Sequence, residues 1–193
     1  IFKTIFIKNK FALHDFLEAA IEKKINEVKI ITGESPLNIK TERQTSFDIN
    51  CTLDDDTYAE IEIQAFNQDY DYGGRAQFYV SRLLASSLEK GNKWNKVPDV
   101  YQISILDFIY EKENKNTVNR YLLRHIDYPV ISSILKSKIN IIFIELPKLN
   151  LVEKKDIIKL SKLEKWALFF KIADKPEKEE ILNLLKNEDG IME

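Results

Sequence analysis

The stretch that decides the fold is residues 46–65, SFDINCTLDDDTYAEIEIQA. On both sides of the run Asp54–Asp56, apolar side chains alternate with polar ones at a period of two, which is typical of half-buried strands. The aspartate run itself predicts a turn. The alternating apolar residues are Phe47, Ile49, Cys51 and Leu53 before the turn, and Ala59, Ile61, Ile63 and Ala65 after it. The stretch therefore predicts an antiparallel hairpin with one apolar face.

The polar face of this hairpin carries acidic side chains that the pairing would bring together. A turn centred on Asp55 sets Asp48 opposite Glu62 and Asn50 opposite Glu60, and only this parity keeps both apolar sets on one face. Directly opposed residues have Cβ atoms about 4.5–5.5 Å apart, so the two carboxylates would repel each other. A divalent cation would offset the repulsion, and Mg²⁺ prefers oxygen ligands. The alternative is a solvated polar face on which both acids point to water.

The segments around the hairpin predict an α/β fold. Apolar residues recur at helical spacing before and after the hairpin, and β-prone runs follow. Helices are expected at 2–8, 11–24, 75–89, 154–172 and 178–185, and further strands at 28–32, 97–110, 121–126 and 139–146, with 97–110 central. Helices and strands in this order indicate a mixed sheet covered on both faces, which would leave the acids in a cleft. Carboxylates in a cleft are typical of functional sites.

Length and charge narrow the class of protein. The chain has 193 residues, which suits a core at 1–150 and a Lys/Glu-rich helical extension at 151–193. Its 11 Phe, 8 Tyr and 2 Trp exclude intrinsic disorder. The net charge of -2 argues against a protein that binds nucleic acid through bulk attraction to phosphate.

Cysteine and histidine usage speaks against a zinc centre. The one cysteine, Cys51, excludes an internal disulfide and a cysteine-based zinc cluster, and it indicates a reducing compartment. Neither His14 nor His125 has a second histidine or cysteine at ligand spacing. No apolar run reaches the length needed to span a bilayer, so no membrane partner is expected. We expect a fragment of a longer cytoplasmic protein.

Several motifs, in their order and spacing, resemble the PD-(D/E)XK nuclease family transposases, the recombination-promoting nuclease group. They are Asp48, then Glu62-Ile63-Gln64, then Arg75 and Tyr79 on the next predicted helix, then the strand QISILDF at 102–108, with flanks at Phe2-Lys3 and at WALFF, 166–170. The resemblance covers nearly the whole chain. It implies a restriction-endonuclease-like mixed β-sheet core flanked by helices, and metal-dependent hydrolysis of DNA phosphodiesters.

The resemblance also implies roles for individual residues. Asp48 and Glu62 would bind Mg²⁺, or Mn²⁺ in its place, with the backbone carbonyl of Ile63 as a third ligand, and the ion would generate a hydroxide nucleophile. Gln64 would be catalytic at the position of the superfamily's lysine. A neutral amide can only hydrogen-bond, whereas a lysine can offset negative charge. The alternative function is therefore a catalytically weak or inactive nuclease-fold module that binds DNA or a protein partner.

The predicted helix after the hairpin carries the candidate DNA contacts. Arg75, Tyr79 and Arg82 are spaced so that they share one helical face. Arg75 lies where the family resemblance falls, and arginine binds phosphate in a bidentate geometry. The alternative is that both arginines are ordinary surface charges and that Tyr79 is a core residue. A double-strand cutter would need two copies of the chain, which predicts a homodimer.

Overall fold

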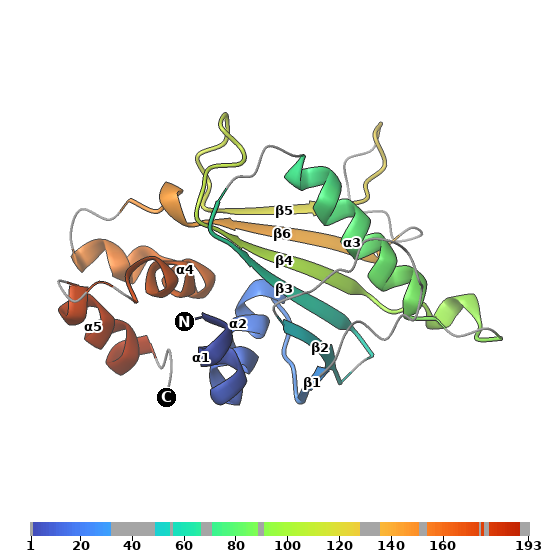
Figure 1. Cartoon of the computed structure of the whole chain (residues 1–193), viewed down its shortest axis with the longest axis horizontal. Coiled ribbons are helices and arrows are strands. Elements are labelled where there is room, and N and C mark those ends of the chain that lie inside the picture. The colour runs from blue at the N-terminus through green and yellow to red at the C-terminus, as the bar shows by residue number, and fades with distance from the viewer. Residues whose placement is uncertain are drawn as a thin grey trace.

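The computed structural model shows a six-stranded mixed sheet with helices on both faces (Figure 1). It describes residues 2–31, 49–54, 56–66, 71–88, 91–127, 136–150, 154–173, 175 and 178–189. The predicted α/β class is confirmed. Residues 33–44, whose polar sequence with Pro36 predicts a loop, lie outside the described residues.

Three antiparallel strands form one part of the sheet, and the other part has a parallel centre. The strands are β1 (Val28–Ile31), β2 (Ile49–Leu53), β3 (Tyr58–Gln64), β4 (Val100–Leu106), β5 (Val118–Leu122) and β6 (Ile139–Glu145), in the order β1-β2-β3-β4-β6-β5. Strand β4 pairs in parallel with both β3 and β6, whereas β5 returns antiparallel to β6. Every residue of β4 is buried, as the predicted central strand requires.

The helices divide between the two faces of the sheet. They are α1 (Phe2–Lys8), α2 (Lys10–Ile21), α3 (Tyr72–Ser86), α4 (Lys162–Ile172) and α5 (Glu179–Asp189). Residues of α1, α2, α4 and α5 share one large apolar core with the sheet, and α3 alone packs on the other face (Figure 1). None of the described helices combines the length and apolar character that crossing a membrane would require.

An aromatic cluster joins the N-terminal helices to α4. The rings of Phe6, Phe16, Trp166 and Phe170 are all fully or almost fully buried. Their centroids lie 5.0–6.1 Å apart, mostly in the edge-to-face or tilted arrangements that aromatic pairs prefer. The Trp166 indole N–H donates to Asp15 on α2 at 2.9 Å, so the buried ring keeps its one polar atom satisfied. Segments about 150 residues apart in the sequence therefore build one core.

Several predicted elements have different bounds in the structure. Helix α3 begins at Tyr72 and not at residue 75, and β4 covers only Val100–Leu106 of the predicted range 97–110. The strand expected at 121–126 is β5, Val118–Leu122, because pairing with β6 begins at Val118 and residues 123–126 lie exposed beyond the ladder. The helix expected at 154–172 is divided into a short 3₁₀ helix, Lys154–Lys159, and α4. Ser161 and Glu164 form a capping box that starts α4 after this break.

A buried carboxylate at the end of β6 holds the segment that follows β4. The Glu145 side chain is 0% exposed and accepts backbone N–H bonds from Tyr110 at 2.7 Å and from Glu111 at 3.2 Å. It also accepts from the Asn119 amide at 2.7 Å and from the Lys148 ammonium at 2.8 Å. Each carboxylate oxygen thus receives two donors, which is why a charge this deep in the protein is tolerated.

Candidate active site

The register of the hairpin between β2 and β3 is the predicted one. Asn50 lies opposite Glu60, and the apolar residues of both strands belong to the core shared with α2. Alternation along β3 places Glu60 and Glu62 on the other face, toward α3. Asp48 lies outside the described residues, so its position opposite Glu62 stays a prediction.

Glu62 is a buried carboxylate that two residues of α3 hold in place. Its side chain is 5% exposed, and its Oε2 atom accepts a hydrogen bond from the Tyr72 hydroxyl at 3.0 Å. The Arg75 guanidinium donates to Oε1 and forms an ion pair with it. Charge-assisted bonds of this kind fix both the position and the rotamer of the carboxylate. The sequence reasoning had not identified Tyr72 as a residue of the site.

The Tyr72 hydroxyl is suited to remain a donor to Glu62. Burial and the adjacent Glu62 charge both raise the pKa of Tyr72 above its ordinary value. Its ring packs against Phe108 and Phe143 on the strand side, with centroids 5.8 and 5.6 Å away. The aromatic packing therefore positions the hydroxyl, and the hydroxyl positions the carboxylate.

The three predicted DNA contacts occupy different surroundings along α3. Arg75 reaches Glu62 and also lies over the Tyr79 ring, 5.0 Å from its centroid. Arg82 lies over the Phe78 ring at 5.9 Å. Tyr79 is half-buried against Arg75, so its exposure is intermediate between that of a DNA contact on the surface and that of a core residue. The structure thus brings Arg75 to the candidate site and leaves the role of all three toward DNA as a prediction.

The residues after Glu62 continue the site along β3. Gln64 is half-buried, and its side-chain amide donates to the Phe66 carbonyl at 2.9 Å. Its backbone carbonyl accepts from Asp107 at the end of β4, at 3.0 Å. The Ile63 side chain packs with the apolar core on the other face, so only its backbone is suited to serve as a ligand.

A second buried acid, Glu60, lies beside Glu62 and was not singled out from the sequence. It pairs with Asn50 on β2 and with Gln102 on β4, so three polar residues cross the sheet in one row. Glu60 is 2% and Gln102 0% exposed, and Ser104 donates to Gln102 at 2.9 Å. Within the described part of the chain, Glu60 Oε2, Asn50 Oδ1 and Gln102 Nε2 lack hydrogen-bond partners. The sequence carries a signal for this row. Residues 60–62 and 102–104 both alternate polar with apolar side chains, and both lie in strands that are buried on both faces.

Burial raises the pKa of Glu60 to about 8, with a further contribution from the Glu62 charge and a partial offset from Arg82. The folded protein therefore binds a proton that the unfolded chain releases near pH 4.5, so this group's stabilising contribution is lost as pH rises from about 4.5 to 8. We expect Glu60→Gln to gain stability over wild type through that window, by up to about 1.4 kcal/mol per pH unit.

The measurement for Glu60 is urea unfolding of both proteins in EDTA at several pH values between 5 and 9, roughly the titration window of the group. Other titrating groups cancel in the difference between the two proteins. Glu113→Gln, at an exposed position, provides the matched control. A wild-type-to-variant difference that stays constant with pH would contradict the prediction.

His14 and Glu18 both form hydrogen bonds to the backbone of the segment that follows α2. The His14 ring donates to the Ile25 carbonyl at 2.6 Å, and Glu18 accepts the Ile25 backbone N–H at 2.9 Å. Both contacts close the turn after α2. Cys51 is buried as predicted, and burial raises the pKa of its thiol to about 12, which makes it unreactive.

Comparison with known proteins tests the resemblance drawn from the motifs. The family model described as PD-(D/E)XK nuclease family transposase matches residues 1–192. The chain belongs to this family. The family assignment made from the sequence is thus confirmed, and the six-stranded mixed sheet flanked by helices is consistent with the restriction-endonuclease-like fold. Neither the curated proteins nor the solved structures yield a match.

Membership of the PD-(D/E)XK group indicates a nuclease-type function, and nucleases of this group typically use divalent metal ions. The donor atoms along β3 fit such an ion, because the Glu62 carboxylate and the Ile63 carbonyl both offer the oxygen ligands that Mg²⁺ prefers. Among the described residues, no three acidic, histidine or cysteine side chains converge into a metal cluster.

Proposed function

We propose that the protein is a divalent-metal-dependent DNA endonuclease of the transposition or recombination type. The observation that carries this proposal is Glu62, a carboxylate that Tyr72 and Arg75 hold in place. The motif resemblance assigns this residue as the second acidic ligand. A charge held this firmly in a buried position is suited to bind an ion in one geometry. The family membership supports hydrolysis of phosphodiester bonds.

The proposed ligands are Asp48, Glu62 and the Ile63 carbonyl, with Mg²⁺ as the ion and Mn²⁺ as its substitute. When bound, the ion would lower the pKa of a water molecule and polarise the phosphoryl oxygen. Arg75 would donate to a phosphate oxygen beside Glu62 and offset the charge that develops there. Gln64 would orient the attacking water through hydrogen bonds, since its amide carries no charge to offset.

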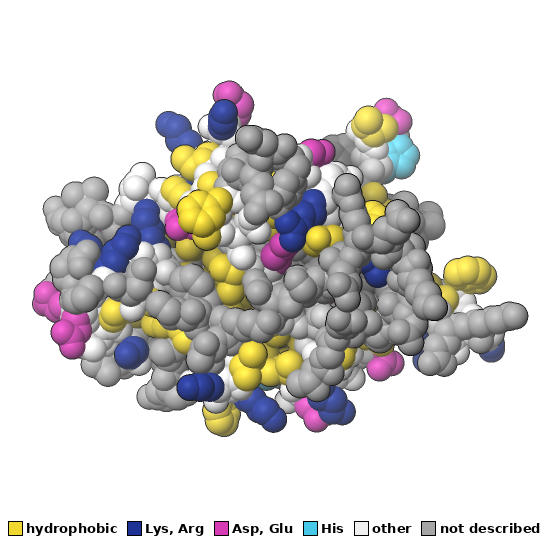
Figure 2. Space-filling model, viewed as in Figure 1, with side chains coloured by type: hydrophobic (Ala, Val, Ile, Leu, Met, Phe, Trp, Pro, Cys, Tyr) yellow, Lys and Arg dark blue, Asp and Glu magenta, His cyan; other side chains and the backbone are white. Residues whose placement is uncertain are grey.

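The proposed DNA contacts are local. Arg75, Tyr79 and Arg82 all lie on α3, and Figure 2 shows basic and acidic side chains interspersed on this face of the molecule. The chain's 29 Lys+Arg against 31 Asp+Glu give no broad cationic surface. We therefore propose weak, salt-sensitive and metal-dependent DNA binding, strengthened in a homodimer, where two copies would supply the two cuts of double-strand cleavage.

The nuclease-like core is assigned to residues 1–150 in this proposal, and residues 151–193 form a helical extension. In the structure α4 packs on α1 and α2 through the aromatic cluster. The extension would thus stabilise the face of the sheet that lies opposite α3. A cytoplasmic location is part of the same proposal, because the protein's substrate would be cellular DNA.

The test is nicking of supercoiled plasmid with Mg²⁺ or Mn²⁺ in a buffer of low ionic strength. We expect wild type to convert plasmid to the open circle, and EDTA to abolish the conversion because the hydroxide nucleophile depends on the ion. Asp48→Ala removes a proposed ligand and is expected to lower the rate to background. Asp127→Ala, at an exposed position away from β3, is the matched control. Equal nicking by wild type and Asp48→Ala would contradict the proposal.

A second candidate function is a nuclease-fold module that binds DNA or a protein partner without cutting. Gln64 favours it, because its amide stands at the lysine position and donates to the Phe66 carbonyl. Metal binding measured by calorimetry, with no hydrolysis in either Mg²⁺ or Mn²⁺, would support this function over the first.

A further inference from the structure

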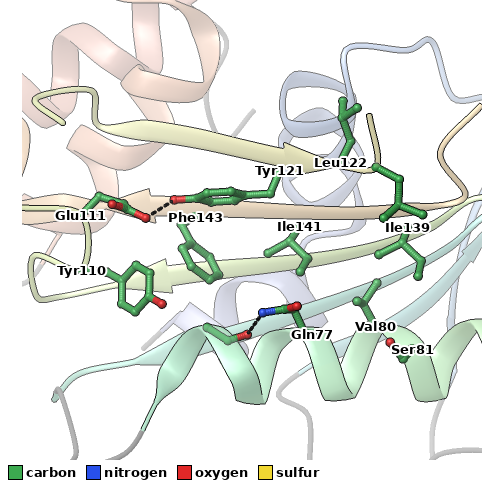
Figure 3. A pocket seen from close by; sticks show the side chains of 12 residues that line it. Gln77, Val80, Ser81, Tyr110, Glu111, Tyr121, Leu122, Ile139, Ile141 and Phe143 are labelled. Atoms are coloured by element: carbon green, nitrogen blue, oxygen red, sulfur yellow. Dashed lines mark hydrogen bonds between the residues drawn. The ribbon is translucent and has the colours of Figure 1, made fainter. Parts of the chain in front are cut away.

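A hollow of about 480 Å³ lies between α3 and the β5–β6 edge of the sheet (Figure 3). Three aromatic side chains, Tyr110, Tyr121 and Phe143, line its sheet side, and Gln77 and Ser81 of α3 form the opposite wall. The Phe143 ring contacts both tyrosines, with centroids 5.2 Å from Tyr110 and 5.3 Å from Tyr121. Its size falls in the range of small-molecule sites.

The hollow is one aromatic ring away from Glu62. The Tyr72 ring lies 5.6 Å from Phe143 and 6.4 Å from Tyr110, while its hydroxyl donates to Glu62. Gly73 forms the rim between the two sites. A Cβ atom at Gly73 would collide with the Tyr110 hydroxyl, so the glycine allows Tyr110 to approach α3 this closely.

Helix α3 therefore serves both sites with different residues. Arg75 reaches Glu62, whereas Gln77 and Ser81 line the hollow. The distance along the helix from Tyr72 to Gln77 is about 7.5 Å, given a rise of 1.5 Å per residue. Glu62 and the hollow are therefore served by residues of α3, Tyr72 and Gln77, that lie less than two helical turns apart.

The chemistry of the hollow favours an uncharged planar ring. Among the described residues that line it, none is a lysine or arginine, and the charged side chain is that of Glu111, which is acidic. That carboxylate accepts the Tyr121 hydroxyl at 2.9 Å and would repel a phosphate. Aromatic faces bind heteroaromatic rings by stacking, and the amide and hydroxyl groups of Gln77 and Ser81 can bond to ring nitrogens and exocyclic groups.

We propose that this hollow receives an unpaired nucleobase of the DNA strand whose phosphate is bound by Arg75 beside Glu62. The inference rests on the proposed function, because only a nucleic-acid substrate places a base next to that phosphate. Enzymes that modify a base hold it outside the stack between aromatic side chains, and proteins that bind single strands stack successive bases on aromatic rings. The site would then act on substrates with an unpaired nucleotide near the cut in preference to a continuous duplex.

The test measures binding of fluorescent oligonucleotides by anisotropy in Ca²⁺, which supports binding without requiring cleavage. A series of oligonucleotides carries a single abasic position moved along the strand. Loss of one stacked base is expected to weaken wild-type binding about 5- to 100-fold at one position, and to leave the other positions nearly unchanged.

Two variants of α3 locate the effect in the hollow. Ser81→Trp would fill it without touching Glu62, and we expect the abasic penalty to disappear because no base can enter. Ala85→Trp adds the same side chain to an exposed position of α3 that does not line the hollow, and it should behave as wild type. Sedimentation of both variants checks that the fold and oligomeric state are unchanged.

The outcomes separate this inference from the proposed nuclease activity. A position-specific penalty without any plasmid nicking would support base binding in the hollow and would contradict the proposed hydrolysis. Metal-dependent nicking with a flat abasic profile would contradict base binding in the hollow and leave the proposed hydrolysis standing. A change of oligomeric state in Ser81→Trp, with the abasic profile intact, would show that the hollow is a protein interface and would overturn the inference as well.

Discussion

We expect Glu62→Gln to lower the rate of plasmid nicking about 1000-fold, the loss typical when one preorganised charged group is removed from a transition state. The substitution preserves the size of the side chain but removes its negative charge. The proposed metal ion would lose a ligand, and the Arg75 guanidinium would face a neutral amide. The Tyr72 hydroxyl can still donate to the amide oxygen, so the change in charge dominates the change in geometry.

The matched control is Glu60→Gln, the same substitution two residues away on the same strand. Glu60 is buried in the Asn50–Gln102 row, and burial keeps its carboxyl protonated at neutral pH, so the amide replaces a group that is already uncharged. We expect this variant to keep its nicking rate within a few-fold of wild type. Initial rates in Mg²⁺ at pH 7.5 compare the two variants. Equal loss in both would mean that the buried row, and not the Glu62 charge, determines the rate.

We expect Glu145→Ala to lower the free energy of unfolding by about 3–5 kcal/mol, the usual loss when one member of a buried ion pair is removed. The Lys148 side chain is 5% exposed and would keep its charge without a partner. The backbone N–H groups of Tyr110 and Glu111 would lose their acceptor as well. Unsatisfied buried donors add to the loss, because each costs about 1–3 kcal/mol.

Urea denaturation followed by tryptophan fluorescence measures this change. Glu113→Ala is the control, since Glu113 is exposed in the same segment and should change stability by less than about 0.5 kcal/mol. Because Tyr110 lines the hollow, Glu145→Ala should also flatten the abasic profile in whatever fraction stays folded. Equal midpoints for the two variants would contradict the role assigned to Glu145.

The hairpin could be predicted from the sequence because its information is local. Alternation from Ile49 to Leu53 fixes which face is apolar, and the aspartate turn fixes the register, so the pairing of Asn50 with Glu60 followed from parity alone. The long apolar pattern of β4 likewise indicated a strand buried on both faces. The same parity set Asp48 opposite Glu62 and Asn50 opposite Glu60, which distinguished Glu62 from Glu60, and the family motifs pointed to the same residue.

The partners of these residues could not be predicted, because they come from segments that meet only in the folded chain. Tyr72 was part of the segment just before the predicted helix, and its bond to Glu62 depends on how α3 crosses the sheet. The shift of β5 depends on the pairing of Val118 with β6, which no local pattern specifies. The hollow has the same origin, since its two walls are far apart in the sequence.

The aromatic cluster has a consequence for the synthesis of the protein on the ribosome. Phe6 and Phe16 emerge before their partners Trp166 and Phe170, which follow about 150 residues later. At about 5–20 residues per second, translation leaves these two rings without their partners for roughly 8 to 30 s. During that interval the nascent chain presents an apolar helical face suited to capture by a chaperone, and this face completes its core only when α4 has been synthesised.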